Sequence, residues 1–407
     1  MNLRHRLSPI LLVGFVCAGL AITPPPASGA EGRKPLKVFL LVGQSNMQGH
    51  AQVRTFEHIG MDPKTAPLLR EMQGADGKPR TCEQVWISYL SSGGEKQGRL
   101  TAGFGADENK IGPEFTFGIR MHKLLNEPIL IIKTAWGGKS LHTDFRSPSS
   151  GPYEFNETQL ETLKKQGKDL AAIRADREKA TGHYYRRMMD HVKKVLGNIK
   201  QVYPDYDSSQ GHELAGFVWF QGWNDMVDRG VYPNRDKPGG YAAYSEALTR
   251  FIRDVRKDLS APDLPFVIGV MGVGGPVKQY LPAQRRYSAI HQNFRDAMAA
   301  PAALPEFRGN VAAVLTENYW DMELVGLRAR ETKIQQQAKQ LSSERKLSRV
   351  EQRATLDDLR TKEFSAREIE TLQKGVSNAE YHYLGSAKIM AQIGVGFAEA
   401  MAEITGK

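Results

Sequence analysis

The hydrophobic positions of this chain fall into short apolar runs separated by longer amphipathic stretches. Five aliphatic or β-branched runs are bounded by polar or glycine residues, at 38–42, 129–132, 217–220, 266–270 and 311–315. Runs of this length that are apolar at nearly every position are typical of strands buried on both faces of a parallel sheet. Between the runs, residues 188–199 and 241–259 repeat apolar side chains three or four positions apart, which predicts helices with one buried face.

The alternation of strands and helices predicts a three-layer α/β/α sandwich with a mostly parallel, five-stranded sheet. Two stretches interrupt the alternation, at residues 143–182 and 323–374. The first is turn-rich and then charged, and the second carries 12 basic and 9 acidic side chains without a sustained heptad repeat. We expect helical insertions on one domain spanning residues 31–407. The second insertion is interpreted as a surface element, with a lid or a dimerisation element as the alternatives.

The first 30 residues have the pattern of a secretory signal peptide. Arg4 and Arg6 precede an apolar stretch at 11–22, and small residues follow at 28–30. The apolar stretch is shorter than the roughly 20 residues of a membrane-spanning helix, and three prolines follow it. We therefore expect cleavage after Ala30, a secreted or periplasmic protein, and no integral membrane segment in the mature chain.

Composition narrows the class of protein further. The chain is 41% hydrophobic and 25% charged, as in soluble globular proteins. After loss of the leader only Cys82 remains, which excludes an intramolecular disulfide and a cysteine–histidine metal cluster. The mature chain keeps 53 basic and 45 acidic residues, a net charge of +8 that is spread along the sequence. This excess is compatible with an anionic glycan, but there is no clustered basic stripe that would predict a nucleic-acid partner.

A serine follows the first predicted strand, in the block GQSNM at residues 43–47. A hydroxyl at the exit of a strand is exposed, and the backbone N–H groups that follow can hold a developing oxyanion. On its own, a serine in this position is more often a turn or N-cap residue. Ser45 is therefore a candidate nucleophile only in combination with other blocks.

Further candidate residues follow the next two strands and precede the last helical pattern. Ligands of parallel α/β sheets bind at the carboxyl ends of the strands, which is where most of these residues fall. The blocks are TAWGGKS with Gly138, WFQGWND with Gln221, Asn224 and Asp225, and YHYLG with His382.

These four blocks, in this order, resemble those of the sialate O-acetylesterase-like carbohydrate esterases, a branch of the SGNH (GDSL-type) hydrolases. The resemblance implies the SGNH fold, no metal or organic cofactor, and hydrolysis of acetyl esters on an oligo- or polysaccharide. It implies Ser45 as nucleophile and His382 as general base, a pairing that serine needs in order to react. It also implies oxyanion donors at the backbone of Ser45 and Gly138 and at one side-chain amide. Asn224 matches the superfamily block and Gln221 matches the block of this branch, so both remain candidates for this side-chain donor.

Two departures from the family pattern concern the acid that orients the histidine. The family usually has an aspartate three residues before the histidine, where this chain has Ala379, and Trp223 replaces a glutamate used by some members. An acid fixes the tautomer of the histidine and stabilises the imidazolium, and it can come from anywhere in the sequence. We favour Asp225 over Glu380, with a more distant carboxylate such as Asp321 as a third option.

Two other functions fit the same residues. The departures at the acid favour a catalytically silent glycan-binding protein on the same fold, and a broad-specificity esterase or lipase is the second alternative. One or two of the tryptophans are expected to stack on a sugar, without a choice among Trp86, Trp136, Trp219 and Trp223. His142 lies near the Gly138 block and is a candidate for contact with substrate. The sequence leaves the glycan and the oligomeric state open.

Overall fold

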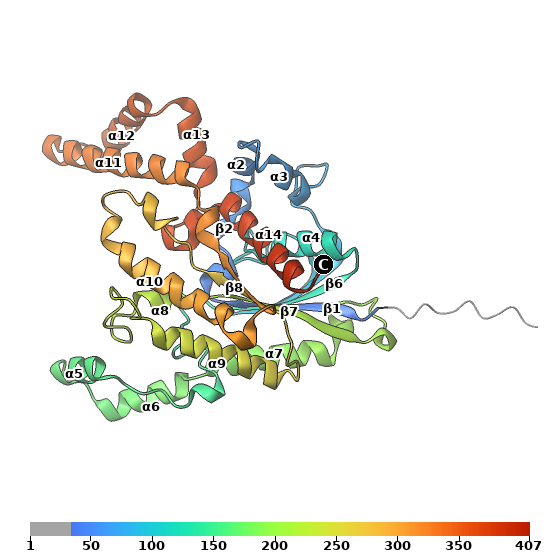
Figure 1. The fold of residues 1–407 in the computed structure, drawn as a ribbon. Helices are drawn as coiled ribbons and strands as arrows, with labels where there is room; N and C mark the ends of the chain where they lie inside the picture. Colours follow the sequence, from blue (N-terminus) through green and yellow to red (C-terminus); the bar gives the residue numbers. More distant parts are fainter. Residues whose placement is uncertain (1–33) are drawn as a thin grey trace, which may run out of the picture. The chain divides into compact units, whose positions relative to one another are not determined.

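The computed structural model of this chain describes residues 34–407, so the predicted leader lies outside the described residues. Residues 35–407 form one compact unit. Within it lies a seven-stranded sheet in the order β4-β3-β6-β1-β7-β8-β9 (Figure 1). Its strands are β1 (Leu36–Gly43), β3 (Cys82–Ser91), β4 (Gly94–Leu100), β6 (Ile129–Ala135), β7 (His212–Phe220), β8 (Phe266–Val270) and β9 (Val311–Leu315).

All five predicted strands are present and pair in parallel, with β1 at the centre between β6 and β7. The expected number of strands is corrected from five to seven, because β3 pairs in parallel with β6 and in antiparallel with β4 at the edge of the sheet. The edge strand β4 is mostly exposed and polar, so it lacks the continuous apolar run that identified the other strands. A further two-stranded ribbon joins β2 (Ala51–Gln52) and β5 (Lys110–Ile111).

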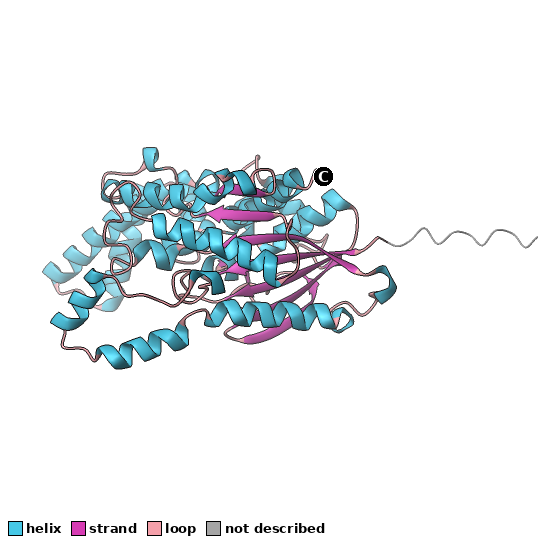
Figure 2. Ribbon diagram, turned by 60° about the horizontal axis from the view of Figure 1, so that its bottom comes forward, coloured by secondary structure: helices cyan, strands magenta, loops and turns pink. Residues whose placement is uncertain are grey.

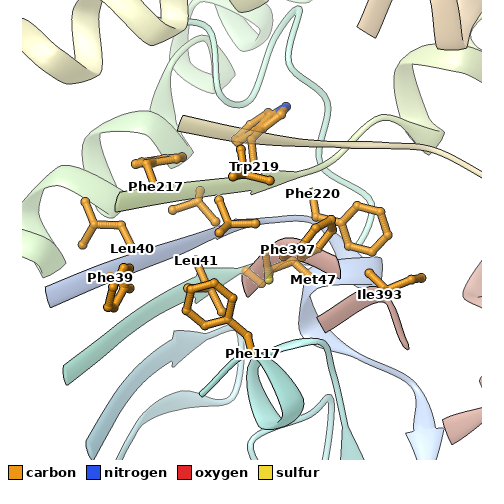
Figure 3. Close-up of a cluster of buried hydrophobic side chains, with 14 of the residues drawn as sticks. Phe39, Leu40, Leu41, Met47, Phe117, Phe217, Trp219, Phe220, Ile393 and Phe397 are labelled. Atoms are coloured by element: carbon orange, nitrogen blue, oxygen red, sulfur yellow. The ribbon is translucent and has the colours of Figure 1, made fainter. Parts of the chain in front are cut away.

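Helices cover both faces of the sheet, which confirms the α/β sandwich (Figures 1 and 2). On one face, the ring of Phe39 lies 5.5 Å from that of Phe117, and the ring of Phe220 lies 5.3 Å from that of Phe397 (Figure 3). On the other face, the ring centroid of Trp219 lies 4.4 Å from that of Phe251. Burying each phenylalanine contributes about 1.5–3 kcal/mol. The helices of the first face are α4 (Glu114–Leu125) and α14 (Ala387–Ile404), and those of the second are α7 (His183–Gly197), α9 (Ala242–Asp258) and α10 (Ser288–Ala299).

Both predicted insertions are helical. The first contains α5 (Glu157–Lys165) and α6 (Leu170–Ala180). The second forms α11 (Met322–Arg345), α12 (Arg349–Glu363) and α13 (Ala366–Gly375). Leu327, Ile334 and Phe364 of this second insertion form a small apolar cluster separate from the main core. Two more short helices, α2 (Phe56–Gly60) and α3 (Ala66–Met72), follow the ribbon strand β2.

Three short elements lie after the strands or before the last helix: α1 (Ser45–Gln48), α8 (Trp223–Val227) and the 3₁₀ segment η10 (Glu380–Gly385). The helices of both insertions lie on the side of the sheet toward which β1 runs (Figure 1). Among residues 34–407, no helix combines the length and the apolarity needed to cross a membrane.

Candidate active site

Ser45 opens the short helix α1 directly after the central strand β1. The chain passes so close to β7 at Gly43 that a Cβ there would lie 2.1 Å from the carbonyl oxygen of Phe220, so glycine is required. Met47 of the same helix is fully buried in the core (Figure 3). Ser45 itself is only half-buried, and within the described residues its hydroxyl has no hydrogen-bond partner. No other group in that part of the chain therefore engages the hydroxyl.

The loop after β6 lies beside this serine. A Cβ on Gly137 would lie 3.9 Å from the Cβ of Ser45, and the N–H of Trp136 donates to the carbonyl oxygen of Gly43 at 3.2 Å. Gly138 has a φ of +75°, in the left-handed region that favours glycine, and the space around it is open. The structure thus brings the Gly138 loop and Ser45 together at the carboxyl edge of the sheet.

His382 lies in η10, which contacts α1. The following residues Tyr383 and Leu384 have φ values of +53° and +60°, an unfavourable conformation for such side chains. The buried Tyr383 hydroxyl holds the turn, because it accepts from the N–H of Gly272 at 2.9 Å and bonds to the Thr316 hydroxyl at 2.7 Å. Strained turns of this kind are concentrated at functional sites.

The ring of His382 has two neighbours that orient it. Its Nδ1 lies 3.0 Å from the Oδ1 of Asn378, and its face stacks on the ring of His50 with centroids 3.9 Å apart and planes 3° apart. Burial, followed by the positive charge of Lys110, lowers the pKa of His382 to about 4. Burial, together with His382 and Lys110, lowers the pKa of His50 to about 3. Both rings are therefore neutral at neutral pH.

Asp225 does not lie against His382, which corrects the preferred choice of acid. The Asp225 carboxylate is fully buried and accepts from His142 Nδ1 at 2.8 Å, from Gln221 Nε2 at 2.6 Å and from the N–H of Leu141 at 2.8 Å. Burial acts to raise the pKa of Asp225, but His142 and these hydrogen bonds hold it below its usual value. The short helix α8 directs this side chain inward, under the loop after β6, so the carboxylate supports that loop.

The other two carboxylates also have different partners. Glu380 accepts from Gln284 Nε2 at 3.0 Å. Asp321 accepts from Lys388 Nζ at 3.0 Å and from the N–H of Leu324, which it caps. Among residues 34–407, the group at His382 Nδ1 is therefore an amide, Asn378. The sequence reading missed Asn378 because it stands four residues before the histidine and not three; a search for any polar side chain in that window would have found it.

The two candidate side-chain amides for the oxyanion differ in their availability. Gln221 Nε2 lies within hydrogen-bond distance of Asp225, the Lys139 carbonyl and Gln44 Oε1, so its two hydrogens are already used. Gln44 is fully buried and links β1 to β7 by also accepting from the N–H of Gly222 at 3.1 Å. Asn224 is half-buried, and its side-chain amide has no partner in the described part of the chain.

The tryptophans divide between core and cleft. Trp136 and Trp219 are fully buried, and Trp86 stacks on Tyr203. Trp223 is half-buried and lines a cavity of about 410 Å³ with Tyr381, whose ring lies 4.4 Å from that of His382. Of the four candidates, Trp223 is therefore the one placed beside the site. Within residues 34–407, no group of three or more His, Cys, Asp or Glu side chains is arranged to hold a metal ion.

Comparison with known proteins identifies the family of the chain. Residues 35–305 match the family described as carbohydrate esterase, sialic acid-specific acetylesterase. The chain belongs to this family of carbohydrate esterases, which confirms the resemblance recognised in the sequence.

Two solved structures are similar to the chain. One is a protein from Arabidopsis thaliana with 18% identity and a TM-score of 0.38, matched over 69% of this chain and 86% of that one. The other is a carbohydrate acetylesterase from Xanthomonas citri with 14% identity and a TM-score of 0.39, matched over 70% of this chain and 51% of that one. No curated protein sequence matches the chain.

Proposed function

We propose that this protein is a serine esterase that removes acetyl groups from a carbohydrate, with Ser45 as nucleophile and His382 as general base. The observation that carries the proposal is the contact between α1, which begins with Ser45, and η10, which contains His382, in a member of a carbohydrate esterase family. A serine and a histidine carried by two contacting elements are parts that acyl transfer needs.

The reaction follows from these positions. His382 Nε2 takes the proton of the Ser45 hydroxyl as Oγ attacks the acetyl carbonyl carbon, and the negative charge moves to the carbonyl oxygen. The N–H groups of Ser45 and Gly138 and the free amide of Asn224 stabilise this oxyanion. His382 then protonates the sugar oxygen, which leaves. Water, activated by His382, releases acetate from the acetyl-serine. No step requires a metal or an organic cofactor.

In this mechanism Asn378 and Asp225 position other groups. The Asn378 carbonyl oxygen accepts from Nδ1–H and so leaves Nε2 unprotonated toward Ser45. Asp225 holds His142, Leu141 and Gln221, and so fixes the loop that carries Gly138. An amide at Asn378 fixes the tautomer but adds no charge to stabilise the imidazolium.

The test is acetate release from acetylated xylan and from 4-nitrophenyl acetate. Wild type should hydrolyse both, and Ser45→Ala and His382→Ala should each lose at least about a thousandfold in kcat. A folded wild type inactive on every acetyl ester would refute the proposal. Nitrophenyl esters of longer acids test the broad-esterase alternative, because an acetyl-specific pocket loses activity sharply beyond two carbons.

The amide at Asn378 favours one other candidate, a glycan-binding protein without activity. A fluorophosphonate probe separates the two functions, since only an activated serine reacts with it. Labelling of wild type but not of Ser45→Ala supports the esterase. A folded, unlabelled wild type that binds glycans supports the silent protein.

We also propose that the enzyme works outside the cytoplasm, as a secreted or periplasmic protein, on an acetylated oligo- or polysaccharide. The leader pattern at residues 1–30 supports this location. Sequencing the amino terminus of the exported protein tests it, and the expected first residue is Glu31.

A further inference from the structure

The cavity beside His382 has aromatic walls. The rings of Trp223 and Tyr381 lie 5.7 Å apart, and Tyr381 is 43% exposed. The cavity of about 410 Å³ has the size of a small-molecule site. A sugar ring next to the one that carries the ester would find two aromatic faces here, directly beside the general base.

A second cavity, of about 680 Å³, continues this one toward the insertion. It lies between residues 281–284 and the helix α11, and it shares Gln284 and Glu380 with the first cavity. The side chains of these two residues are hydrogen-bonded to each other at 3.0 Å, so the two cavities meet across one polar pair. Together the two cavities extend from Tyr381, the neighbour of His382, to α11, and we call them the insertion groove.

The insertion groove is positively charged. Its lining contains Arg229 and Arg235 in the first cavity and Arg328, Arg330 and Lys333 in the second, against Glu380 as the acidic member.

Most of these cations are available to a ligand. Arg330 is paired with Glu363 and Glu368. Arg229, Arg328 and Lys333 form no ion pair within residues 34–407. His291, also in the lining, adds no charge at neutral pH, because burial and then Arg295 lower its pKa to about 4. Unpaired cations along a groove attract a ligand with repeated negative charges.

We propose that the insertion groove binds a glycan chain whose sugar units carry carboxylates, so that the preferred substrate is an acetylated polyuronate. The acetylated unit lies at Ser45, a neighbouring sugar stacks on Trp223 and Tyr381, and carboxylates further along the chain pair with Arg328 and Lys333 of α11. This inference rests on the proposed esterase function and names its substrate class. The insertion at 323–374 then serves as part of the binding site.

The experiment compares three acetyl esters: acetylated polygalacturonate, acetylated glucomannan as a neutral polymer, and 4-nitrophenyl acetate. For wild type, kcat/KM on the polygalacturonate should exceed that on glucomannan by at least about tenfold at low salt. The ratio of the two kcat/KM values should fall toward one at about 0.5 M NaCl, because salt screens exposed charges.

Paired variants locate the effect. Arg328→Glu with Lys333→Glu reverses two charges in the groove and should lower the ratio of polygalacturonate to nitrophenyl acetate activity by about tenfold or more. Lys339→Glu with Arg353→Glu makes the same change of charge on α11 and α12 outside the groove and should leave the ratio unchanged. Equal kcat/KM on both polymers, or an equal effect of both pairs, overturns the inference. If the groove pair does not fold, the salt dependence of wild type decides.

A binding measurement distinguishes failure of the groove proposal from failure of the proposed esterase function. Affinity electrophoresis of Ser45→Ala in gels containing deacetylated polygalacturonate needs no catalysis. Salt-sensitive retardation, reduced by the groove pair, supports the groove even if no ester is cleaved. A wild type that cleaves 4-nitrophenyl acetate but is not retarded by polygalacturonate keeps the esterase and overturns the groove.

Discussion

At the scale of single residues, His382, the proposed general base, contacts an amide and an imidazole. Asn378 accepts at Nδ1 of His382, and the His50 ring stacks on its face. Within residues 34–407 both ring nitrogens of His50 are buried without a hydrogen-bond partner. Neither neighbour offers a negative charge to the imidazolium, and burial, followed by the positive charge of Lys110, lowers the pKa of His382.

The first prediction is a change of pH profile with Asn378→Asp. Only the neutral imidazole accepts the serine proton, so wild-type kcat/KM should fall as the pH drops through about 4, the pKa of His382. A carboxylate next to Nδ1 favours the imidazolium and should raise this pKa by about 1 unit or more, which moves the acid limb to higher pH. Initial rates on 4-nitrophenyl acetate between pH 3 and 8 measure the shift.

Asn378→Ala is the control for this prediction, because it removes the hydrogen bond without adding a charge. It should lower kcat by about ten- to hundredfold through loss of orientation. Two results would contradict the explanation. One is an acid limb of the wild-type pH profile near the ordinary histidine pKa of about 6.5, and the other is an acid limb at the same pH in Asn378→Asp and in wild type.

At the scale of elements, the short helix α1, which begins with Ser45, is held by a buried ion pair. Lys133 of β6 and Glu114 of α4 are both fully buried, with Nζ 2.6 Å from the carboxylate. Lys133 also donates to the carbonyl oxygen of Gln48, the last residue of α1, at 2.9 Å. Burial raises the pKa of Glu114 and lowers that of Lys133, and each charge opposes the shift of the other. The pair thus joins a strand, a helix and the turn that carries Ser45.

The second prediction concerns this pair. Lys133→Met leaves Glu114 as an uncompensated buried carboxylate and should lower the free energy of unfolding by about 3–5 kcal/mol at neutral pH. The double variant Lys133→Met with Glu114→Gln removes both charges and should be less destabilised. Urea unfolding measures both. A double variant no more stable than the single one would show that the charge left behind is not the cause.

At the scale of the whole molecule, residues 35–407 combine a sheet with a well-packed main core and an insertion with a core of its own. The rings and aliphatic side chains of the main cluster surround β1, whereas Leu327, Ile334 and Phe364 pack separately. The insertion returns to the body through Lys374, which pairs with Glu57 of α2. A segment with a small separate core is expected to open locally before the sheet does.

The third prediction follows from this separation. Phe364→Ala should reduce the stability of the insertion by up to about 3–5 kcal/mol, because it removes the largest side chain of the small cluster. Native-state hydrogen exchange should then show lost protection in α11–α13 and unchanged protection in β1, β6 and β7. Val350→Ala on α12, at a side chain that is 79% exposed, is the matched control and should change neither. Equal loss of protection in the sheet would mean that the insertion and the body unfold together.

The sequence by itself determined the strands β1, β6, β7, β8 and β9, the positions of Ser45 and Gly138 after strands, and that of His382 before the last helix. These features are local: a buried strand must be apolar on both faces, and a residue that follows a strand stands at the carboxyl edge of the sheet wherever the rest of the chain goes. The helical insertions were predictable because their charged composition is also a local property of the sequence.

Only the tertiary structure decided which side chains meet. The Asp225 carboxylate turns to His142, 83 positions away, and Asn378 takes the contact with His382 that a carboxylate was expected to make. The edge strand β4 forms because β3 offers it a partner, and the insertion groove exists because α11 lies beside residues 281–284. A sequence pattern records how far each residue is buried, whereas a pair of side chains depends on how whole elements pack against one another.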